Sequence, residues 1–297
     1  MKKLVFCFSL CGFVLSGCKN EPSVNPDEDR QVVINFSASS LSASLLKSDA
    51  TSDEKSISKI ILFGIKQGNS LEKNYPAIEG QELIDALEGE DVKRTISKNV
   101  KTLYAIANPS ATLETAAAGC TDLSGLLGLT ESFVTAPTSN FLMGGKGDVD
   151  NKTADIELVR AVAKIEIISG STDFTITSVT VQNTPNQGFV FQQETAIVPT
   201  SATTIYPLST NTTLYVAESA KGNPVKFAIS GSFNGEDVNF PPISLTIEGK
   251  NIDIVRNTHY KVSVTPKTTD ECSITISIRG WGEPMVTDPQ EIDFDNL

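Results

Sequence analysis

The sequence predicts an all-β protein made of β-sandwiches with a few short helices, and three observations carry this prediction. Apolar residues alternate with polar ones over several short runs, and each run ends in Gly, Pro, Asn or Asp. This period-two pattern is typical of half-buried antiparallel strands joined by turns. At 297 residues the chain has the length of two ordinary domains. The clearest runs are Val225, Phe227 and Ile229; Ile243, Leu245 and Ile247; Tyr260, Val262 and Val264; and Ile274, Ile276 and Ile278.

The N-terminus has the layout of a secretory signal. Met1–Lys3 are cationic, Leu4–Leu15 are apolar, and Leu15–Cys18 (LSGC) place small residues before a cysteine. The apolar stretch is shorter than the roughly 20 residues that span a membrane, so we expect a removed signal rather than a transmembrane helix. The LSGC string matches the lipobox of bacterial lipoproteins, in which Cys18 receives lipid and becomes the first residue. The alternative is an ordinary secretory cleavage site.

Charge and cysteine content narrow the classes of partner. Loss of the signal removes Lys2 and Lys3, which leaves 22 basic and 36 acidic residues and a net charge of -14. This balance disfavours nucleic acid and anionic membrane surfaces as partners. Only Cys120 and Cys272 remain after Cys18. Because nothing local predicts that they pair, we expect two small buried apolar residues and leave a disulfide open.

The first half begins with a tether, because residues 19–30 contain two prolines and mixed charge without apolar periodicity. Order begins at Gln31, where period-two alternation predicts one or two strands. The alternating residues are Val32, Ile34, Phe36 and Ala38 and then, with the phase shifted by one, Leu41, Ala43 and Leu45. A polar segment, Lys47–Lys59, follows. The further predicted elements are a buried strand at Ile60–Ile65, a helix at Gln81–Glu88, a strand at Leu103–Ala107, and a helical turn that Thr112 caps and that leads to Gly119.

The second half begins near Glu157, because Asp148–Asp155 is polar and a strand is predicted to start at Leu158. Along that strand the apolar residues Ala161, Ala163, Ile165 and Ile167 face one way, and Arg160, Lys164 and Glu166 face the other. We expect the basic residues to pair with acidic ones at the domain junction, in a structural role. Trp281 is expected to be a core or interface aromatic rather than a sugar platform.

No pattern for catalysis, metal or cofactor binding emerges. The single histidine, His259, alternates with Tyr260 and is expected to face solvent; one His and two distant cysteines cannot build a zinc site. No Gly-x-Ser-x-Gly elbow precedes it. Gly144–Gly147 lacks phosphate-loop spacing and is predicted to form a turn. The acidic clusters Asp27–Asp29 and Asp293–Asp295 lack the spacing of a calcium loop.

Five strings, in this order, resemble the fimbrillin family, whose members are subunits of type V pili. They are residues 106–109 (IANP), 141–145 (FLMGG), 158–167 (LVRAVAKIEI), 215–218 (YVAE) and 255–262 (VRNTHYKV). The resemblance covers nearly the whole chain after Cys18. It implies two transthyretin-like β-sandwich domains, export as a lipoprotein, and assembly by strand exchange after an outer-membrane protease removes the first strand.

The resemblance implies roles for particular segments. The removable strand would be Gln31 to about Leu46, an edge strand whose loss exposes an apolar groove that a neighbour's strand fills. The cut would follow Lys47, with Ser48 as the new N-terminus. Family members commonly carry Arg in this loop, whereas this chain has Lys47 there, and that difference disfavours an Arg-specific protease. Lys55 lies further along the chain, and a cut at Arg30 would leave the strand in place.

The donor strand would come from the C-terminus. Its candidate apolar positions are Met285, Val286, Ile292 and Phe294. Pro284 and Pro289 interrupt pairing, so two alternatives stay open: a strand that completes its own sandwich and a loose end. These expectations divide the chain into a signal (1–17), a tether and removable strand (18–47), a first domain (48–157) and a second domain (158–297) with the donor tail.

The predicted function is that of a structural subunit of a type V pilus that serves adhesion, without catalysis or cofactor. Its expected partners are other pilus subunits, as a homopolymer, and a maturation protease, with membrane contact only through lipid on Cys18. The expected location is first an outer-membrane lipoprotein precursor and then a cell-surface fimbria. The alternatives are an anchor or tip subunit, or a monomeric glycan-binding surface lipoprotein.

Overall fold

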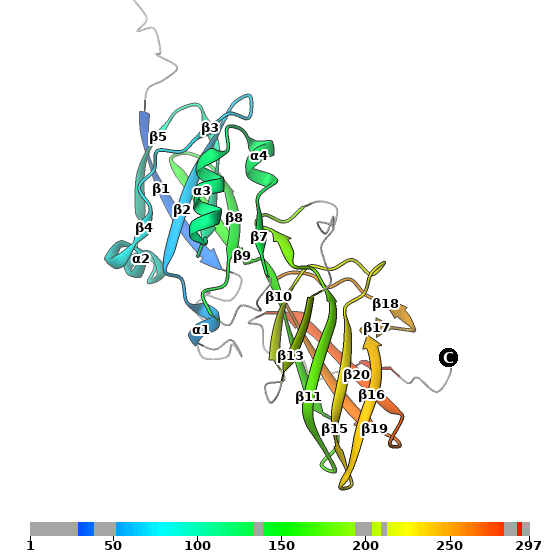
Figure 1. The fold of residues 1–297 in the computed structure, drawn as a ribbon. Coiled ribbons are helices and arrows are strands. Elements are labelled where there is room, and N and C mark those ends of the chain that lie inside the picture. The colour runs from blue at the N-terminus through cyan, green and yellow to red at the C-terminus, as the bar shows by residue number, and fades with distance from the viewer. Residues whose placement is uncertain are drawn as a thin grey trace, which may run out of the picture.

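The computed structural model describes residues 29–38, 52–133, 139–193, 204–208, 213–281 and 290–292. Several predicted positions fall outside these ranges: Cys18, Lys47 and Ser48, Met285 and Val286, and Phe294. The model is mostly β, as predicted, with four short helices among the described residues (Figure 1). No helix in the described ranges is both long enough and apolar enough to span a membrane.

The first half of the chain forms one eight-stranded sheet. Its strands are β1 (Asp29–Ala38), β2 (Lys59–Lys66), β3 (Leu71–Glu72), β4 (Ile78–Glu79), β5 (Val92–Ser97), β6 (Val100–Ala107), β8 (Met143–Asp148) and β9 (Thr153–Arg160). The order is β3-β2-β6-β8-β9-β1-β5, and β4 also pairs with β2. The predicted strands at Ile60–Ile65 and Leu103–Ala107 are confirmed as β2 and β6.

The helices are α1 (Ser52–Lys55), α2 (Gly80–Leu87), α3 (Ala111–Gly119) and α4 (Leu123–Leu127). The helix predicted at Gln81–Glu88 is confirmed as α2, which buries Leu83 and Ala86 but leaves Ile84 and Leu87 exposed. The turn predicted from Thr112 is also confirmed, as α3. Its cap is Ser110 instead, whose hydroxyl accepts a hydrogen bond from the Leu113 amide at 3.1 Å.

The second half is a sandwich of a five-stranded and a four-stranded sheet, ordered β14-β10-β19-β20-β21 and β13-β11-β15-β16. These strands are β10 (Val162–Ser169), β11 (Phe174–Thr184), β13 (Thr204–Leu208), β14 (Thr213–Ala217), β15 (Lys226–Phe233), β16 (Glu236–Ser244), β19 (Thr258–Pro266), β20 (Cys272–Gly280) and β21 (Gln290–Ile292). Two small ribbons pair β7 (Thr130–Ser132) with β12 (Gln187–Phe189) and β17 (Thr246–Ile247) with β18 (Lys250–Asn251). Alternating residues of both sheets fill one core, as their period-two pattern predicts; Val179, Phe227, Val262 and Ile276 are examples.

The strand predicted to start at Leu158 is two strands in two sheets. β9 ends at Arg160 and β10 begins at Val162, so the expected boundary beside Glu157 falls inside β9. The Ala161 amide donates to the Leu142 carbonyl of the first half at 2.9 Å, and the Val162 carbonyl accepts from the Asn257 amide of the second half at 2.8 Å. The buried apolar positions change phase there, from Ile156 and Leu158 in the first core to Ala163 and Ile165 in the second. The prediction of one strand overlooked this change of phase.

The glycine cluster Gly144–Gly147 is not the predicted turn but part of β8, between β6 and β9. The backbone of neighbouring segments explains the composition. A Cβ at Gly145 would collide with the Glu157 carbonyl, and one at Gly147 would collide with the Asp155 carbonyl. Glycine here permits close approach within a sheet instead of a reversal of the chain.

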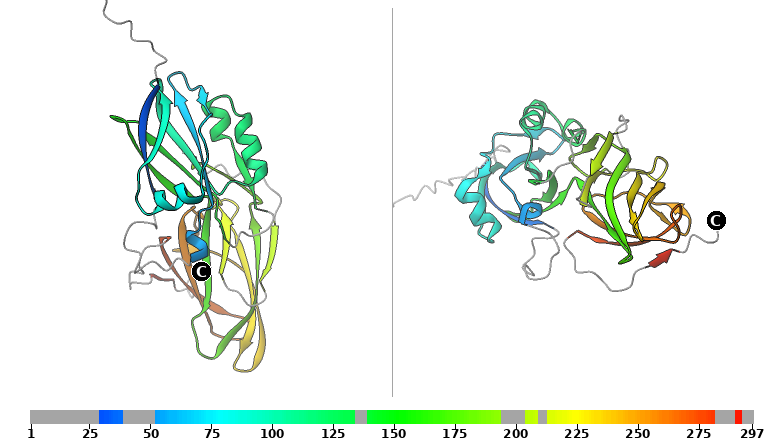
Figure 2. Two further views of the ribbon diagram at one scale, coloured as in Figure 1. Left: turned by 90° about the vertical axis from the view of Figure 1, so that its left-hand side faces the viewer. Right: turned by 60° about the horizontal axis from the view of Figure 1, so that its bottom comes forward.

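A third apolar cluster joins the two halves (Figures 1 and 2). It draws Phe63 and Ile106 from the first sheet, Leu113 from α3, and Tyr215 and Trp281 from the second half. In both views α1 lies at this junction, directly after the segment that contains Lys47. Figure 2 also shows β21, in red, at the outer side of the second sandwich.

Candidate functional site

β1 occupies a slot between two strands, with its first half (29–34) paired to β5 and its second half (33–38) paired to β9. It runs parallel to β9, with Val33 opposite Thr153 and Phe36 opposite Ile156, and antiparallel to β5, with Val32 opposite Arg94. The expectation of an edge strand is therefore wrong: β1 is next to the edge, and β5 lies outside it. The reason is that β5, which follows later in the chain, adds to the free side of β1.

The side chains of β1 fit the slot as their alternation predicts. Val32 and Ile34 are both 0% exposed, and Phe36 packs against the same core. Polar bonds hold the outer positions: the Arg30 guanidinium donates to the Val100 carbonyl at 2.9 Å, and the Asn35 amide group donates to the Asp155 carboxylate at 2.8 Å. Withdrawal of β1 would leave an apolar slot with unpaired backbone groups on both walls.

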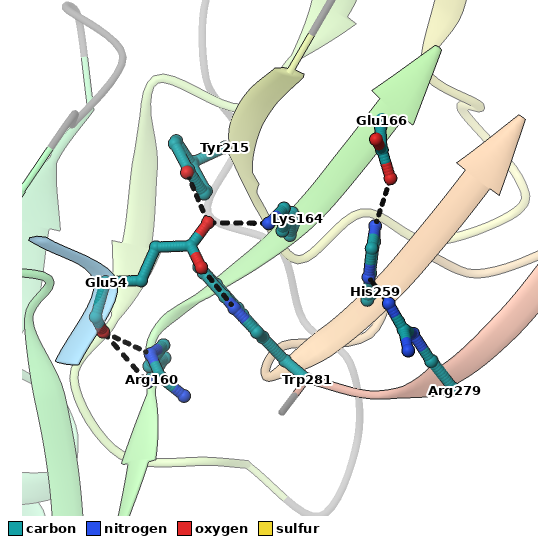
Figure 3. A network of polar contacts seen from close by, with 8 residues as sticks. All are labelled: Glu54, Arg160, Lys164, Glu166, Tyr215, His259, Arg279 and Trp281. Carbon is teal, nitrogen blue, oxygen red and sulfur yellow. Dashed lines mark hydrogen bonds and ion pairs between the residues drawn. The ribbon is translucent and has the colours of Figure 1, made fainter. Parts of the chain in front are cut away.

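The segment after the slot is fastened by a buried carboxylate (Figure 3). Glu54, in α1, is 1% exposed. Its carboxylate binds the Lys164 ammonium at 2.7 Å and accepts from the Tyr215 hydroxyl at 2.6 Å and the Trp281 indole at 3.4 Å. The expected pairing of Lys164 with an acidic residue at the junction is confirmed. Its partner comes from the polar segment Lys47–Lys59, in which the sequence singled out no acidic residue.

Arg160, the last residue of β9, completes this junction. Its guanidinium donates to the Glu54 carbonyl at 2.8 Å and to the Asn257 side chain at 3.1 Å, and it lies 4.5 Å from the centre of the Trp281 ring. Burial lowers the pKa of Arg160 to about 10, against the opposing effect of the Glu54 charge. Burial also raises the pKa of Tyr215, and its bond to Glu54 adds to that shift.

The aromatic residues at this junction are packed against one another. Trp281 is 1% exposed and stacks on Tyr215 with 5.3 Å between ring centres, which confirms it as a core aromatic. Trp281 precedes the C-terminal tail directly, whereas Glu54 follows the processing segment. The end of the processing segment and the start of the C-terminal tail are thus both attached to this one buried cluster.

His259 is buried, so the expectation that it faces solvent is wrong; it is 2% exposed. It points away from the sandwich core, as alternation predicts, but long neighbouring side chains cover it. Its imidazole lies 3.2 Å from the Glu166 carboxylate and accepts from Arg279 at 2.9 Å (Figure 3). The bond to His259 lowers the pKa of Glu166.

The strings that carried the family resemblance meet near this junction. Besides Arg160 and Lys164, Arg256 binds the Glu218 carboxylate at 2.6 Å and the Val190 carbonyl at 2.9 Å. Asn257 is the side chain that Arg160 contacts. These motif residues therefore join strands and halves of the structure.

At the C-terminus, β21 pairs with β20, with Ile292 opposite Ile274. Gln290–Ile292 therefore adds a strand to its own sheet, which was one of the three alternatives for the tail. Cys120 and Cys272, which were expected to be small buried residues, are only partly buried, and the two are free rather than paired. Burial raises the pKa of Cys272 to about 11.

The parts of the chain that the structure describes contain no group of three or more metal-ligating side chains.

Several solved structures have the same fold. A proposed cell adhesion protein from Bacteroides eggerthii has a TM-score of 0.57 at 18% identity, covering 86% of this chain and 97% of that one. The tip fimbrial protein Mfa3 from Porphyromonas gingivalis gives 0.55 at 12%, covering 86% and 100%. A proposed cell adhesion protein from Parabacteroides distasonis gives 0.58 at 13%, covering 86% and 100%. The fold is thus one that fimbrial and adhesion proteins adopt.

The family follows from the sequence itself. The model of the fimbrillin-A associated anchor proteins Mfa1 and Mfa2 matches residues 127–286, more than half of the chain. The chain belongs to this family, which confirms the fimbrial resemblance seen in its motifs. Among curated proteins, none matches it.

Proposed function

We propose that this fimbrial protein is a stalk subunit: a lipoprotein precursor, matured by cleavage after Lys47 and polymerised by strand exchange through the slot of β1. The observation that carries the proposal is the position of β1. It fills an apolar slot with a strand on each side, and the segment after it contains Lys47 and leads to α1. A cut there separates β1 from the rest of the fold without breaking any paired strand of the first sheet.

Two further observations support this proposal. Glu54 and Arg160 hold the chain that follows the processing segment, so a new N-terminus at Ser48 would lie close to a fixed point. Trp281, the only tryptophan, is buried in the junction, which argues against a sugar-stacking surface lipoprotein. The mature protein would be located in a cell-surface fimbria, with adhesion as its work and other pilus subunits as its partners.

An anchor subunit is the second candidate, because the matching family model describes anchor proteins. An anchor would keep lipid on Cys18 and would keep β1 in its slot. The well-packed β1, with Val32 and Ile34 fully buried, suits this role as long as the segment around Lys47 stays uncut.

The test is the mature N-terminus, determined by mass spectrometry on protein sheared from the cell surface and on protein left in the membrane. The stalk proposal expects sheared material that starts at or near Ser48 and forms a ladder of multimers. Protein that starts only at lipidated Cys18 and retains β1 would overturn it and favour the anchor. A Lys47→Gln variant, which removes the proposed cleavage residue, should stop the ladder, whereas Lys55→Gln should not.

A further inference from the structure

The outer wall of the slot, β5, depends on β1 for its strand pairing. Across the described ranges, β1 is the strand with which β5 pairs, over six residue pairs from Asp29–Ser97 to Ile34–Val92. Loss of β1 removes that whole ladder. The chain then connects β5 to β6 through the short turn at Lys98 and Asn99. Unless something else holds it, β5 would move and the slot would close or widen.

Side-chain bonds hold the middle of β5. Both terminal nitrogens of Arg94 bind the Glu82 carboxylate, at 2.6 and 2.8 Å, and one also reaches the Pro76 carbonyl at 3.4 Å. The Arg94 side chain is 9% exposed, whereas that of Glu82 is 44% exposed. A two-point bond between guanidinium and carboxylate fixes orientation as well as distance. Arg94 therefore ties β5 to α2 without involving β1.

A second bond holds the end of β5. The Ser97 amide donates to the Glu72 carboxylate at 3.1 Å. That carboxylate is itself positioned by the Tyr75 hydroxyl at 2.6 Å and by the Lys66 ammonium at 2.9 Å. Glu72 belongs to β3, on the far side of the sheet order from β5. This contact therefore closes the sheet around the core.

Apolar packing acts in the same direction. Val92 and Ile96 are buried, and they share a core with Ile78 of β4 and with Leu83 of α2. Val92, Arg94 and Ile96 are alternate residues of β5, so they lie on the same, inward face. Val92 and Ile96 also share this core with Val32 and Ile34 of β1, which a cut would release. Residues 72–86 supply both polar ties and the core residues Ile78 and Leu83, and they stay in the chain after a cut at Lys47.

We propose that residues 72–86 form a brace for β5, with Arg94–Glu82 and Ser97–Glu72 as its polar ties, and that this brace keeps the empty slot open for an incoming strand of a second copy. The inference rests on the proposed function. It makes Arg94 and Glu82 positioning residues for strand capture, with a smaller role in the intact precursor, where β1 also holds β5.

The test measures capture of a strand by protein that has lost β1. A specific protease sequence replaces residues 44–50, the purified full-length chain is cut, and a labelled peptide with the sequence of residues 29–38 (DRQVVINFSA) is added in excess. Peptide uptake is followed by fluorescence anisotropy and mass spectrometry. Unfolding of the uncut chain in urea is measured in parallel.

The brace predicts that Arg94→Gln and Glu82→Gln each slow uptake of the peptide by at least about tenfold, the loss expected for one charge-assisted tie. Arg94→Lys, which keeps the charge but not the two-point bond, should fall between them and the wild type. Glu114→Gln is the matched control, because it breaks the Lys59–Glu114 bridge elsewhere on the same sheet. In the uncut chain, where β1 also holds β5, Glu82→Gln and Glu114→Gln should lose about the same small amount of stability, because each removes one partly exposed ion pair.

Two outcomes would overturn the inference, and they are distinguishable. If the cut wild type captures the peptide and the Arg94 and Glu82 variants capture it equally fast, the brace is wrong and strand exchange stands. If the cut wild type neither releases β1 nor captures the peptide, the proposed function fails and the brace fails with it. Should Arg94→Gln not fold, Glu82→Gln decides, because its side chain is more exposed.

Discussion

The first and last strands of the structure differ in how they are held. β1 is ten residues long, pairs on both sides and buries Val32 and Ile34 fully. β21 is three residues long and pairs with β20 at the edge of its sheet. Many hydrogen bonds and a large apolar area must be given up to remove the first, and few to remove the second. Under the proposed function, this difference would explain why release of the N-terminal strand needs a protease whereas a C-terminal tail can be donated without one.

The largest expected effect on stability is at the buried cluster of Glu54, Lys164 and Trp281, to which the processing segment and the C-terminal tail are both attached. Glu54→Gln removes the charge that pairs with the buried Lys164, and an unpaired buried charge costs about 3–5 kcal/mol of unfolding free energy. Urea denaturation measures this loss. Adding Lys164→Met to Glu54→Gln should recover most of it. A single variant within about 0.5 kcal/mol of the wild type would contradict the role of Glu54 as a fixed point.

The strength with which β1 is held can be measured at its centre. Ile34→Ala in the uncut chain should cost about 2–5 kcal/mol, because it opens a cavity among fully buried residues. Ser37→Ala, on the exposed face of the same strand, is the control and should change stability by less than about 0.5 kcal/mol. Equal effects at the two positions would show that β1 does not pack as described.

Acid should weaken the wall of the slot. Hydrogen bonds from Arg94 lower the pKa of Glu82; burial alone would raise that of Glu72, but bonds from Tyr75, Lys66 and Ser97 outweigh it and lower the pKa. A lowered folded-state pKa gives stability that is present above the usual value of 4.5 and lost as the pH falls through the folded-state value.

Because Glu82 is partly exposed, its share is below about 1 kcal/mol. Urea midpoints between pH 6 and pH 3 for the wild type and Glu82→Gln measure it. The two proteins should differ at pH 6 and converge toward pH 3. A constant difference over that range would contradict the assignment.

The smallest expected effect on stability is at the other end of the chain. Removal of residues 282–297 deletes β21 and should change the unfolding free energy by less than about 1 kcal/mol, since the described part of this segment, Gln290–Ile292, forms a short ladder at the edge of its sheet. In the proposed stalk it should nevertheless abolish multimers on native gels. A truncated chain that still polymerises would show that the donor lies elsewhere, and a large loss of stability would show that β21 is not freely released.

Local pattern explains what the sequence could predict. Val32, Ile34, Phe227 and Val262 alternate because each strand has one face in a core, and this requires no knowledge of partners. The buried run at Ile60–Ile65 was equally readable. The pairing partners of the strands could not be predicted in this way. The sequence of β1 does not indicate that β5 will lie outside it, because β5 is formed by residues more than fifty positions away.

The junction shows the same limit for side chains. Arg160, Lys164, Arg256 and Asn257 stood out as motif residues, but their contacts come from different sheets. Glu54 gave no local signal, because one acidic residue in a polar segment looks like solvated charge until the fold brings Lys164 to it. His259 was misplaced for the same reason: alternation gives the face of a strand but not what covers it.

The slot of β1 has one parallel and one antiparallel wall. A replacement strand that enters in the reverse sense would again make one ladder of each kind, and a period-two pattern read backwards still directs alternate side chains inward. The backbone of the slot therefore does not select the direction of the strand that fills it. In an assembly built by strand exchange, the polarity of the filament would be decided by the donor subunit, where its tail leaves Trp281, and by how far the eight residues from 282 to 289 let that tail reach, about 26 Å when extended.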